Sequence, residues 1–239
     1  IAFRDRFGIR PLVYGINNND YIISSESVAI DTLGFDLIRD VKPGEIILFE
    51  KDSYPRFHIV NNSELYPCLF EYIYFSRIDS IINGISIYEA RYELGKLLGE
   101  KIKKLEITDI DMIIPVPDSS LIFGLGLQES LNVNLKYGLV KNSYIDRTFI
   151  MKDDKIINKS IKRKLNLVKN IITNKNILII DDSVVRGNTS KHIVQLAKNA
   201  GAKKIYMASG APPILFPNKY GIFIESKKEL IAVDRTFKD

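Results

Sequence analysis

The sequence predicts an α/β fold in which helices cover both faces of a parallel sheet, preceded by an incomplete β-rich segment. Two observations lead to this prediction. From about residue 86 onward, short apolar runs alternate with segments of helical periodicity, which is typical of βαβ units. Before residue 60, short β-rich runs are separated instead by turn-forming residues. With 239 residues, 46% of them hydrophobic, the chain can build a core in one large domain or two small ones.

Residues 1–60 are expected to form short strands joined by turns. The expected strands cover residues 12–14, 21–24 and 45–49. Asparagine and aspartate at residues 17–20, and the Lys-Pro-Gly run at residues 42–44, supply turns between them. Residues 25–33 can form a short helix. The segment opens without a preceding partner strand, so we expect it to be incomplete.

Residues 86–239 are expected to form the α/β domain. Ser86 followed by Glu89 is a capping box, and a helical period of apolar residues comes after it. One expected helix begins at residue 86. Two others cover residues 119–131 and 189–200, and Gly201 ends the last of them. The expected strands cover residues 111–116, 134–140, 176–180 and 204–209. Strands that are apolar throughout are usually buried on both faces, as in a parallel sheet.

Composition narrows the class of protein. No apolar run approaches the length needed to span a bilayer, and no signal peptide is visible, so we expect no membrane partner. The single cysteine, Cys68, cannot form an internal disulfide, and we expect no iron–sulfur cluster because four thiolates are usual for one. A reducing cytoplasm is the simple inference. Because the chain starts with Ile1 and not with methionine, we expect a fragment or a processed product.

The net charge and the two histidines say little about the function of the chain. The net charge of +5 and the pI of about 9.0 would suit a polyanionic ligand, but lysines are frequent all along the chain, and we expect no nucleic-acid partner. The two histidines, His58 and His192, have no other metal-ligand residues at fixed spacing. We interpret both as ordinary surface or half-buried residues.

Two strand ends carry polar side chains. The strand at residues 176–180 runs into Asp181 and Asp182, and the strand at residues 112–116 runs into residues 117–120. Ligands of open parallel sheets bind beyond the carboxyl ends of strands. Two adjacent carboxylates at a buried strand end need a cation or hydroxyl donors.

The loop after the acidic pair leads into a helix. A helix start offers free N–H groups and a positive dipole end, which suits a phosphate, and Gly187 permits a tight turn there. Acceptors for sugar hydroxyls beside donors for a phosphate match a ribose 5-phosphate. The alternative is an acidic strand end with an ordinary helix cap. A Walker loop and a Rossmann fingerprint are both absent from the sequence.

The run from Ile179 to Ser190 resembles the phosphoribosyl-pyrophosphate motif of type I phosphoribosyltransferases. Other runs resemble one branch of them, the glutamine-dependent amidophosphoribosyltransferase family. Residues 7–12 and 25–27 resemble part of its N-terminal-nucleophile glutaminase domain, residues 67–75 the segment joining its two domains, and residues 147–150 and 162–165 its mobile loop over the substrate. The similarity covers essentially the whole chain.

The resemblance implies a reaction. Ammonia derived from glutamine attacks the anomeric carbon of phosphoribosyl pyrophosphate, pyrophosphate leaves, and 5-phosphoribosylamine forms in purine biosynthesis. It also implies a Mg²⁺ cofactor and a homo-oligomer, and its metal ligands would be Ser120, Asp181 and Asp182. The implied substrate-binding residues are Asp181, Asp182, Ser183, Val184, Val185, Arg186, Gly187, Asn188, Thr189 and Ser190, with Arg147, Lys152 and Arg163 in the closing loop.

The resemblance also implies three regions. Residues 1–60 would be the end of an incomplete glutaminase domain, residues 61–85 an interdomain segment, and residues 86–239 a phosphoribosyltransferase domain truncated at its C-terminal end. The family's glutaminase uses an N-terminal cysteine, which this chain lacks, and Cys68 is no substitute because it has no nearby histidine base. We therefore assign no catalytic residue and expect no glutamine hydrolysis by this chain alone.

Two alternatives to an enzyme stay open. Some type I phosphoribosyltransferase folds serve as non-catalytic modules that sense nucleotides or phosphoribosyl pyrophosphate. The glutaminase remnant and the basic loop segment argue against a sensor, which needs neither. An inactive remnant of a split or decaying gene is the other alternative, and the missing ends favour it over the sensor.

Overall fold

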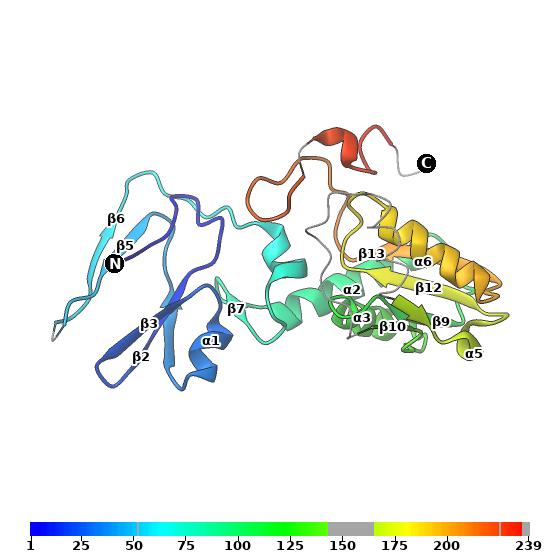
Figure 1. Cartoon of the computed structure of the whole chain (residues 1–239), viewed down its shortest axis with the longest axis horizontal. Coiled ribbons are helices and arrows are strands. Elements are labelled where there is room, and N and C mark those ends of the chain that lie inside the picture. Colours follow the sequence, from blue (N-terminus) through cyan, green and yellow to red (C-terminus); the bar gives the residue numbers. More distant parts are fainter. Residues whose placement is uncertain (52, 143–164, 225, 236–239) are drawn as a thin grey trace. The chain divides into compact units, whose positions relative to one another are not determined.

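The computed structural model describes residues 1–51, 53–142, 165–224 and 226–235. The chain divides into two compact units. The first consists of Ile1–Ala90 with Lys219–Ile222, and the second of Arg91–Asn218 with Phe223–Asp239 (Figure 1). The predicted division at residues 60 and 85 stays a prediction, because it concerns functional domains and not compactness alone.

The first unit contains two antiparallel three-stranded sheets. One has the order β1-β5-β6, formed by β1 (Ala2–Phe3), β5 (Glu45–Leu48) and β6 (Arg56–Ile59). The other has the order β3-β2-β4, formed by β2 (Val13–Asn17), β3 (Asp20–Ser24) and β4 (Asp36–Asp40). Helix α1 (Ser27–Thr32) follows β3. The predicted strands at 12–14, 21–24 and 45–49 and the short helix are thus present, whereas β1, β4 and β6 were not predicted.

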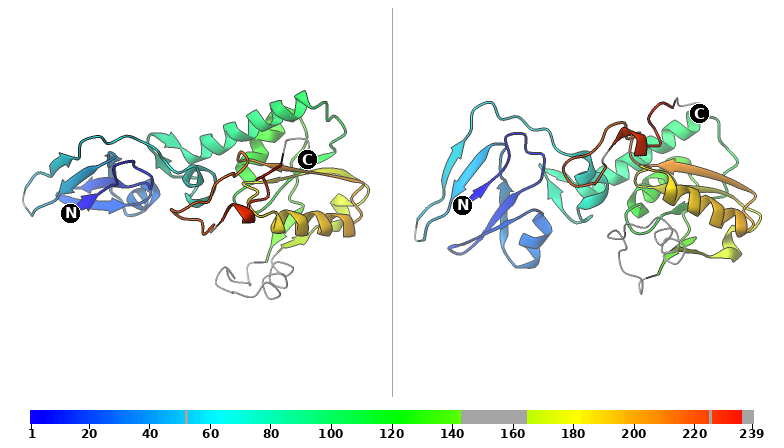
Figure 2. Two further views of the ribbon diagram at one scale, coloured as in Figure 1. Left: turned by 90° about the horizontal axis from the view of Figure 1, so that it is seen from above. Right: turned by 45° about the horizontal axis from the view of Figure 1, so that its top comes forward.

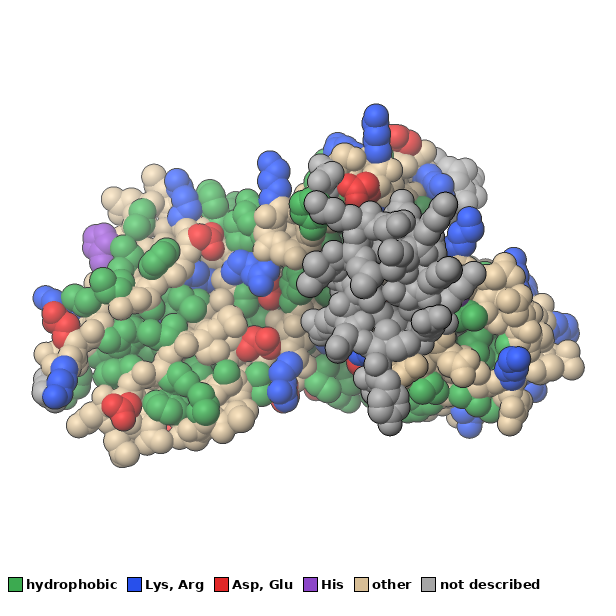
Figure 3. All heavy atoms as spheres, in the orientation of Figure 1, with side chains coloured by type: hydrophobic (Ala, Val, Ile, Leu, Met, Phe, Trp, Pro, Cys, Tyr) green, Lys and Arg blue, Asp and Glu red, His purple; other side chains and the backbone are tan. Residues whose placement is uncertain are grey.

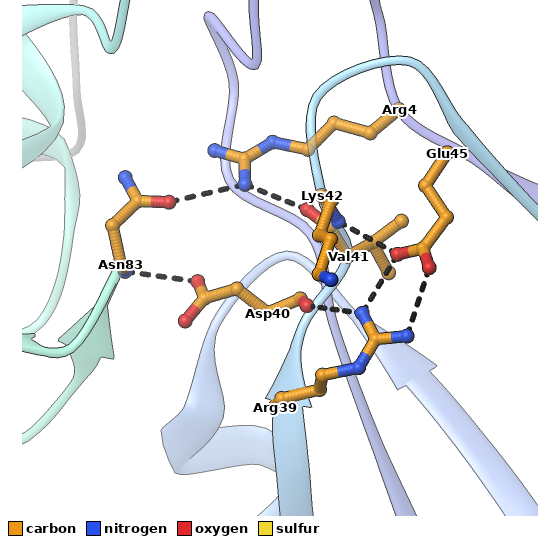
Figure 4. A network of polar contacts seen from close by, with 7 residues as sticks. All are labelled: Arg4, Arg39, Asp40, Val41, Lys42, Glu45 and Asn83. Atoms are coloured by element: carbon orange, nitrogen blue, oxygen red, sulfur yellow. Dashed lines mark hydrogen bonds and ion pairs between the residues drawn. The ribbon is translucent and has the colours of Figure 1, made fainter. Parts of the chain in front are cut away.

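Tyr14, Val41 and Ile47 form the core between the two sheets, and a polar network lies beside it. The Arg39 guanidinium donates to both carboxylate oxygens of Glu45, at 2.7 and 2.8 Å (Figure 4). Burial alone would raise the pKa of Glu45, but Arg39 and the Lys42 amide outweigh it and hold the pKa below its usual value. This network joins β4 to β5 in the way expected of a buried carboxylate.

Hydrophobic side chains remain exposed on the first unit (Figure 3). Phe3 and Ile46 are register partners in β1 and β5, and their side chains are 72% and 37% exposed. Their neighbours in the strands, Ala2 and Ile47, are buried. Alternation along β1 and β5 therefore gives this strand pair one buried side and one exposed apolar side, whereas all four residues of β6 are exposed.

Short elements connect the sheets to a long helix. They are the π-helical turn η1 (Glu71–Phe75) and the hairpin of β7 (Ile81–Ile82) with β8 (Ile85–Ser86), and the long helix is α2 (Ile87–Lys104). The Ser86 hydroxyl accepts from the Glu89 amide at 3.3 Å, which is one half of the predicted capping box.

The second unit is built on a parallel sheet with the order β13-β12-β9. Its strands are β9 (Met112–Pro115), β12 (Asn176–Asp181) and β13 (Lys204–Ser209), and its main helices besides α2 are α3 (Leu121–Leu131) and α6 (Asn188–Asn199). Buried residues of α6, Ile193 and Ala197, pack with Ile177 and Ile179 of β12 on one face of the sheet. Gly124 of α3 lies against the opposite face, because a Cβ on it would lie 3.7 Å from Ile180 (Figure 2). Helices on both faces of a parallel sheet confirm the predicted fold class.

The prediction of a strand of this sheet at residues 134–140 is wrong. Residues 134–138 make only an isolated bridge, Leu135 with Ile113, and the chain then forms β10 (Leu139–Lys141), which pairs antiparallel with β11 (Leu165–Leu167) in a separate ribbon. The segment makes two backbone hydrogen bonds with Ile113, through the Asn134 carbonyl and the Lys136 amide, and then leaves the sheet, with Tyr137 63% exposed. The short helices α5 (Lys169–Ile172) and η2 (Lys227–Glu229) also belong to this unit.

Within the described residues, no helix is both long enough and apolar enough to cross a membrane.

Candidate phosphoribosyl-binding site

The predicted acidic pair lies at the carboxyl end of the central strand. Asp181 is the last residue of β12, Asp182 follows it, and the two residues are only 7% and 6% exposed. β9 lies parallel to β12 with Pro115 opposite Ile180, so both strands end at the same edge. The chain after β9 therefore reaches the acidic pair.

Serine hydroxyls surround the two carboxylates. Ser120, which is completely buried, donates to Asp181 at 3.3 Å, and Ser119 donates to Asp182. Ser183 donates to the other oxygen of Asp182 at 2.5 Å. The predicted proximity of residues 117–120 to the acidic pair is thus present in the structure. Oxygen atoms from two strand ends converge on one edge of the sheet.

Burial alters the acidity of both carboxyl groups. Burial, and then the neighbouring charge of Asp182, raises the pKa of Asp181 to about 7. Burial also raises the pKa of Asp182, although Ser119, Ser183 and the buried Arg91 of α2 oppose the shift. The site therefore favours a bound cation or hydroxyl donors, which would stabilise the charged forms.

The loop from Ser183 to Gly187 turns into the N-terminus of α6. Gly187 has a φ of +77°, which glycine adopts without strain, and a Cβ there would lie 2.5 Å from the Ile231 side chain. The next three residues, Asn188, Thr189 and Ser190, form the first turn of α6. The first N–H groups of a helix have no intrahelical partner and can receive a phosphate.

The Arg186 side chain is engaged outside the loop. Its Nε donates to Glu229 at 2.7 Å, and its Nη2 donates to the Phe223 carbonyl at 2.8 Å. Of the loop residues predicted to bind substrate, Arg186 is the one whose side chain is held by a segment further along the sequence. Val184 and Val185 can offer only backbone groups to a phosphate, and the Val185 carbonyl accepts from the Ile231 amide at 2.9 Å.

Three predicted substrate residues lie outside the described residues, namely Arg147, Lys152 and Arg163. Conversely, three residues close to the site were assigned no binding role from the sequence. Ser119 stands next to the predicted Ser120, so its position in the same turn was a usable signal. Arg91 and Glu229 lie far from the motif in sequence, and no spacing rule connects them to it.

The donor set fits a hard cation only in part. Asp181, Asp182 and Ser120 offer oxygen ligands, which Mg²⁺ prefers. In the ranges that the structure describes, no group of three or more His, Cys, Asp or Glu side chains is placed to hold a metal ion. Because Mg²⁺ keeps waters and takes substrate phosphates as ligands, two carboxylates suffice when a pyrophosphate is present.

The parallel sheet with helices on both faces, and the polar side chains at the carboxyl ends of its strands, are those of a phosphoribosyltransferase. Residues 86–210 match the phosphoribosyl transferase domain family, and the chain belongs to that family. Within it, the chain is similar to amidophosphoribosyltransferases. It is 49% identical to the Escherichia coli enzyme of that name and 44% identical to the Saccharomyces cerevisiae one, with 98% of this chain and 48% of each relative covered. The chain thus spans about half the length of the curated relatives it matches.

A solved structure agrees with these relatives. The glutamine phosphoribosylpyrophosphate amidotransferase from B. subtilis, complexed with ADP and GMP, superposes with a TM-score of 0.85 at 35% identity. The match covers 97% of this chain and 50% of that one. The similarity therefore extends beyond the phosphoribosyltransferase domain into the first unit.

Proposed function

We propose that this chain binds phosphoribosyl pyrophosphate and forms 5-phosphoribosylamine from it and ammonia, as part of an amidophosphoribosyltransferase of purine biosynthesis. The observation that carries the proposal is the buried pair Asp181 and Asp182 beside a loop that opens into the N-terminus of α6. A sugar 5-phosphate needs both halves, hydroxyl acceptors for the ribose and N–H donors for the phosphate. The similarity to enzymes of that name supports it independently.

Each half of the site has a separate task. Asp181 and Asp182 would accept from the ribose hydroxyls or hold Mg²⁺ together with Ser120. Residues 183–190 would surround the 5-phosphate with N–H and hydroxyl donors. Fixing both ends of the sugar places the anomeric carbon where ammonia can attack and pyrophosphate can leave.

Charge on the departing pyrophosphate must be stabilised. Mg²⁺ bound there would neutralise part of that charge. Arg147, Lys152 and Arg163 belong to a basic segment that would close over the substrate and exclude water. For the whole protein, the proposal also includes glutamine as the source of ammonia and a homo-oligomeric assembly.

The three predicted regions enter this proposal. Residues 1–60 would be the end of a glutaminase domain, residues 61–85 the connection and residues 86–239 the transferase domain. The similarity of the first unit to the same relatives supports this organisation.

Pyrophosphate release tests the proposal. The chain is incubated with phosphoribosyl pyrophosphate, magnesium and ammonium, and pyrophosphate is measured over time. We expect release that depends on ammonium and is lost in the double variant Asp181→Asn/Asp182→Asn. Saturable substrate binding without any release would favour the sensor instead, and the absence of both would favour the inactive remnant.

A further inference from the structure

The loop expected to hold the 5-phosphate is attached to a segment more than thirty residues further along the chain. That segment runs from Phe223 to Ile231 and contains η2. Both the loop and the residues from Phe223 onward belong to the second unit, so their contacts lie within one compact body.

Glu229 is the centre of the attachment. Its Oε2 accepts from Arg186 Nε at 2.7 Å and from Arg186 Nη2 at 2.5 Å. Its Oε1 accepts from the Ser226 amide at 3.1 Å, as part of the capping box that begins η2. One carboxylate therefore links the start of η2 to the loop guanidinium. A guanidinium held by two of its nitrogens loses most of its freedom to rotate.

Two further contacts join the same segments. The Ile231 amide donates to the Val185 carbonyl at 2.9 Å, and the Ile231 side chain lies against Gly187, where a Cβ would come within 2.5 Å. The attachment thus fixes Val185, Arg186 and Gly187 in succession. These residues form the turn that aims the N–H groups of the first turn of α6.

We propose that Arg186 and Glu229 are positioning residues, which hold the 5-phosphate loop in its binding conformation, and that Arg186 does not itself bind the phosphate. The inference rests on the proposed function, because it names how the phosphate half of that site is kept in shape. Arg186 Nε and Nη2 already donate to the Glu229 carboxylate and the Phe223 carbonyl, so three of the five N–H groups of the guanidinium point away from a phosphate in the loop. A loop preorganised by a salt bridge binds more tightly because less ordering is left to the ligand.

A double-mutant cycle separates positioning from direct binding. Binding of ribose 5-phosphate, and of pyrophosphate with magnesium, is measured by calorimetry on the whole chain and on Arg186→Ala, Glu229→Ala and the double variant. We expect each single variant to weaken ribose 5-phosphate binding about tenfold, with the double variant no weaker than either. Pyrophosphate, which lacks the 5-phosphate, should bind as before. Glu229→Gln should fall between wild type and Glu229→Ala.

Asp109→Ala is the matched control. Asp109 makes an exposed contact of 3.1 Å with Lys204, at the opposite ends of the strands of the same sheet. This variant should bind ribose 5-phosphate and pyrophosphate as the wild type does. Thermal melting checks that every variant is folded at the temperature of the titration.

Different outcomes overturn different statements. If Arg186→Ala weakens ribose 5-phosphate binding while Glu229→Ala leaves it unchanged or tightens it, Arg186 is a phosphate ligand and the positioning role is wrong. If wild type binds neither ligand, the proposed function fails instead. In that case, amide hydrogen exchange of residues 183–190 still tests whether Glu229 holds the loop. Loss of amide protection in Glu229→Ala would support it, and unchanged protection would overturn it.

Discussion

At the scale of single residues, the acidic pair is chemically unusual. Two adjacent aspartates are almost completely buried, and their carboxylates accept hydrogen bonds from serine hydroxyls and a neighbouring amide. Burial without a full countercharge makes the neutral form of Asp181 stable close to neutral pH. The residue therefore changes charge in the range in which an enzyme works, and a cation or a substrate hydroxyl would select the charged form.

The raised pKa of Asp181 predicts how the stability of the free chain changes with pH. This pKa is about 7 in the folded state, against 3.8 for an ordinary aspartate, so protonation of Asp181 favours folding. That contribution is complete below about pH 4 and is lost as the pH rises through about 7. We expect the melting temperature of Asp181→Asn to fall less than that of wild type between about pH 5 and about pH 8. Equal slopes in the two proteins would show that Asp181 titrates normally.

At the scale of elements, the site depends on a turn between β12 and α6. Gly187 is the residue at which the loop becomes a helix, and its φ of +77° is left-handed. The same residue touches Ile231, so the turn has both a conformational and a packing requirement. A side chain at this position would disturb the loop from two directions.

Gly187→Ala should therefore be destabilising beyond ordinary glycine replacement. We expect a loss of about 1–2 kcal/mol from the left-handed backbone, with a further cost from the contact with Ile231. Gly34→Ala is the matched control, because Gly34 has a similar φ of +73°, and a Cβ added to it would have no other atom within 4 Å. Urea unfolding measures both. Equal losses in the two variants would mean that the Ile231 contact is unimportant.

The elements also show what the sequence could and could not predict. The strand at 176–181 was predictable because it is a long apolar run that ends in charge. The strand proposed at 134–140 was not, because an apolar pattern does not say which strand will be its hydrogen-bonding partner. Strand β4 begins and ends with aspartate, and β1 has two residues, so neither carries a strong strand pattern.

The candidate site, too, has parts that the sequence predicts and parts that it does not. Asp181, Asp182 and the loop follow from one continuous motif at a strand end. The salt bridge of Arg186 to Glu229 joins residues 43 positions apart and depends on a tertiary fold that no local pattern encodes. The resemblance implied a substrate-binding role for Arg186, and nothing in the sequence alone indicated that its guanidinium donates to Glu229.

At the scale of the whole molecule, we propose different tasks for the two units. The second unit holds the site within one compact body, together with the loop and the segment attached to it. The first unit shares the similarity to amidophosphoribosyltransferases and has a sheet face with exposed apolar side chains. The chain spans about half of its relatives' length, so the complete reaction is a proposal for the whole protein.

Direct titration of the chain with phosphoribosyl pyrophosphate in the presence of magnesium tests the central claim. We predict saturable one-site binding that weakens about tenfold or more in Asp181→Asn/Asp182→Asn, because charged acceptors for the ribose or the metal are lost. Asp109→Asn, which alters a carboxylate at the other end of the sheet, should bind as wild type does. Equal affinity in wild type and in the double variant would contradict the role assigned to the acidic pair.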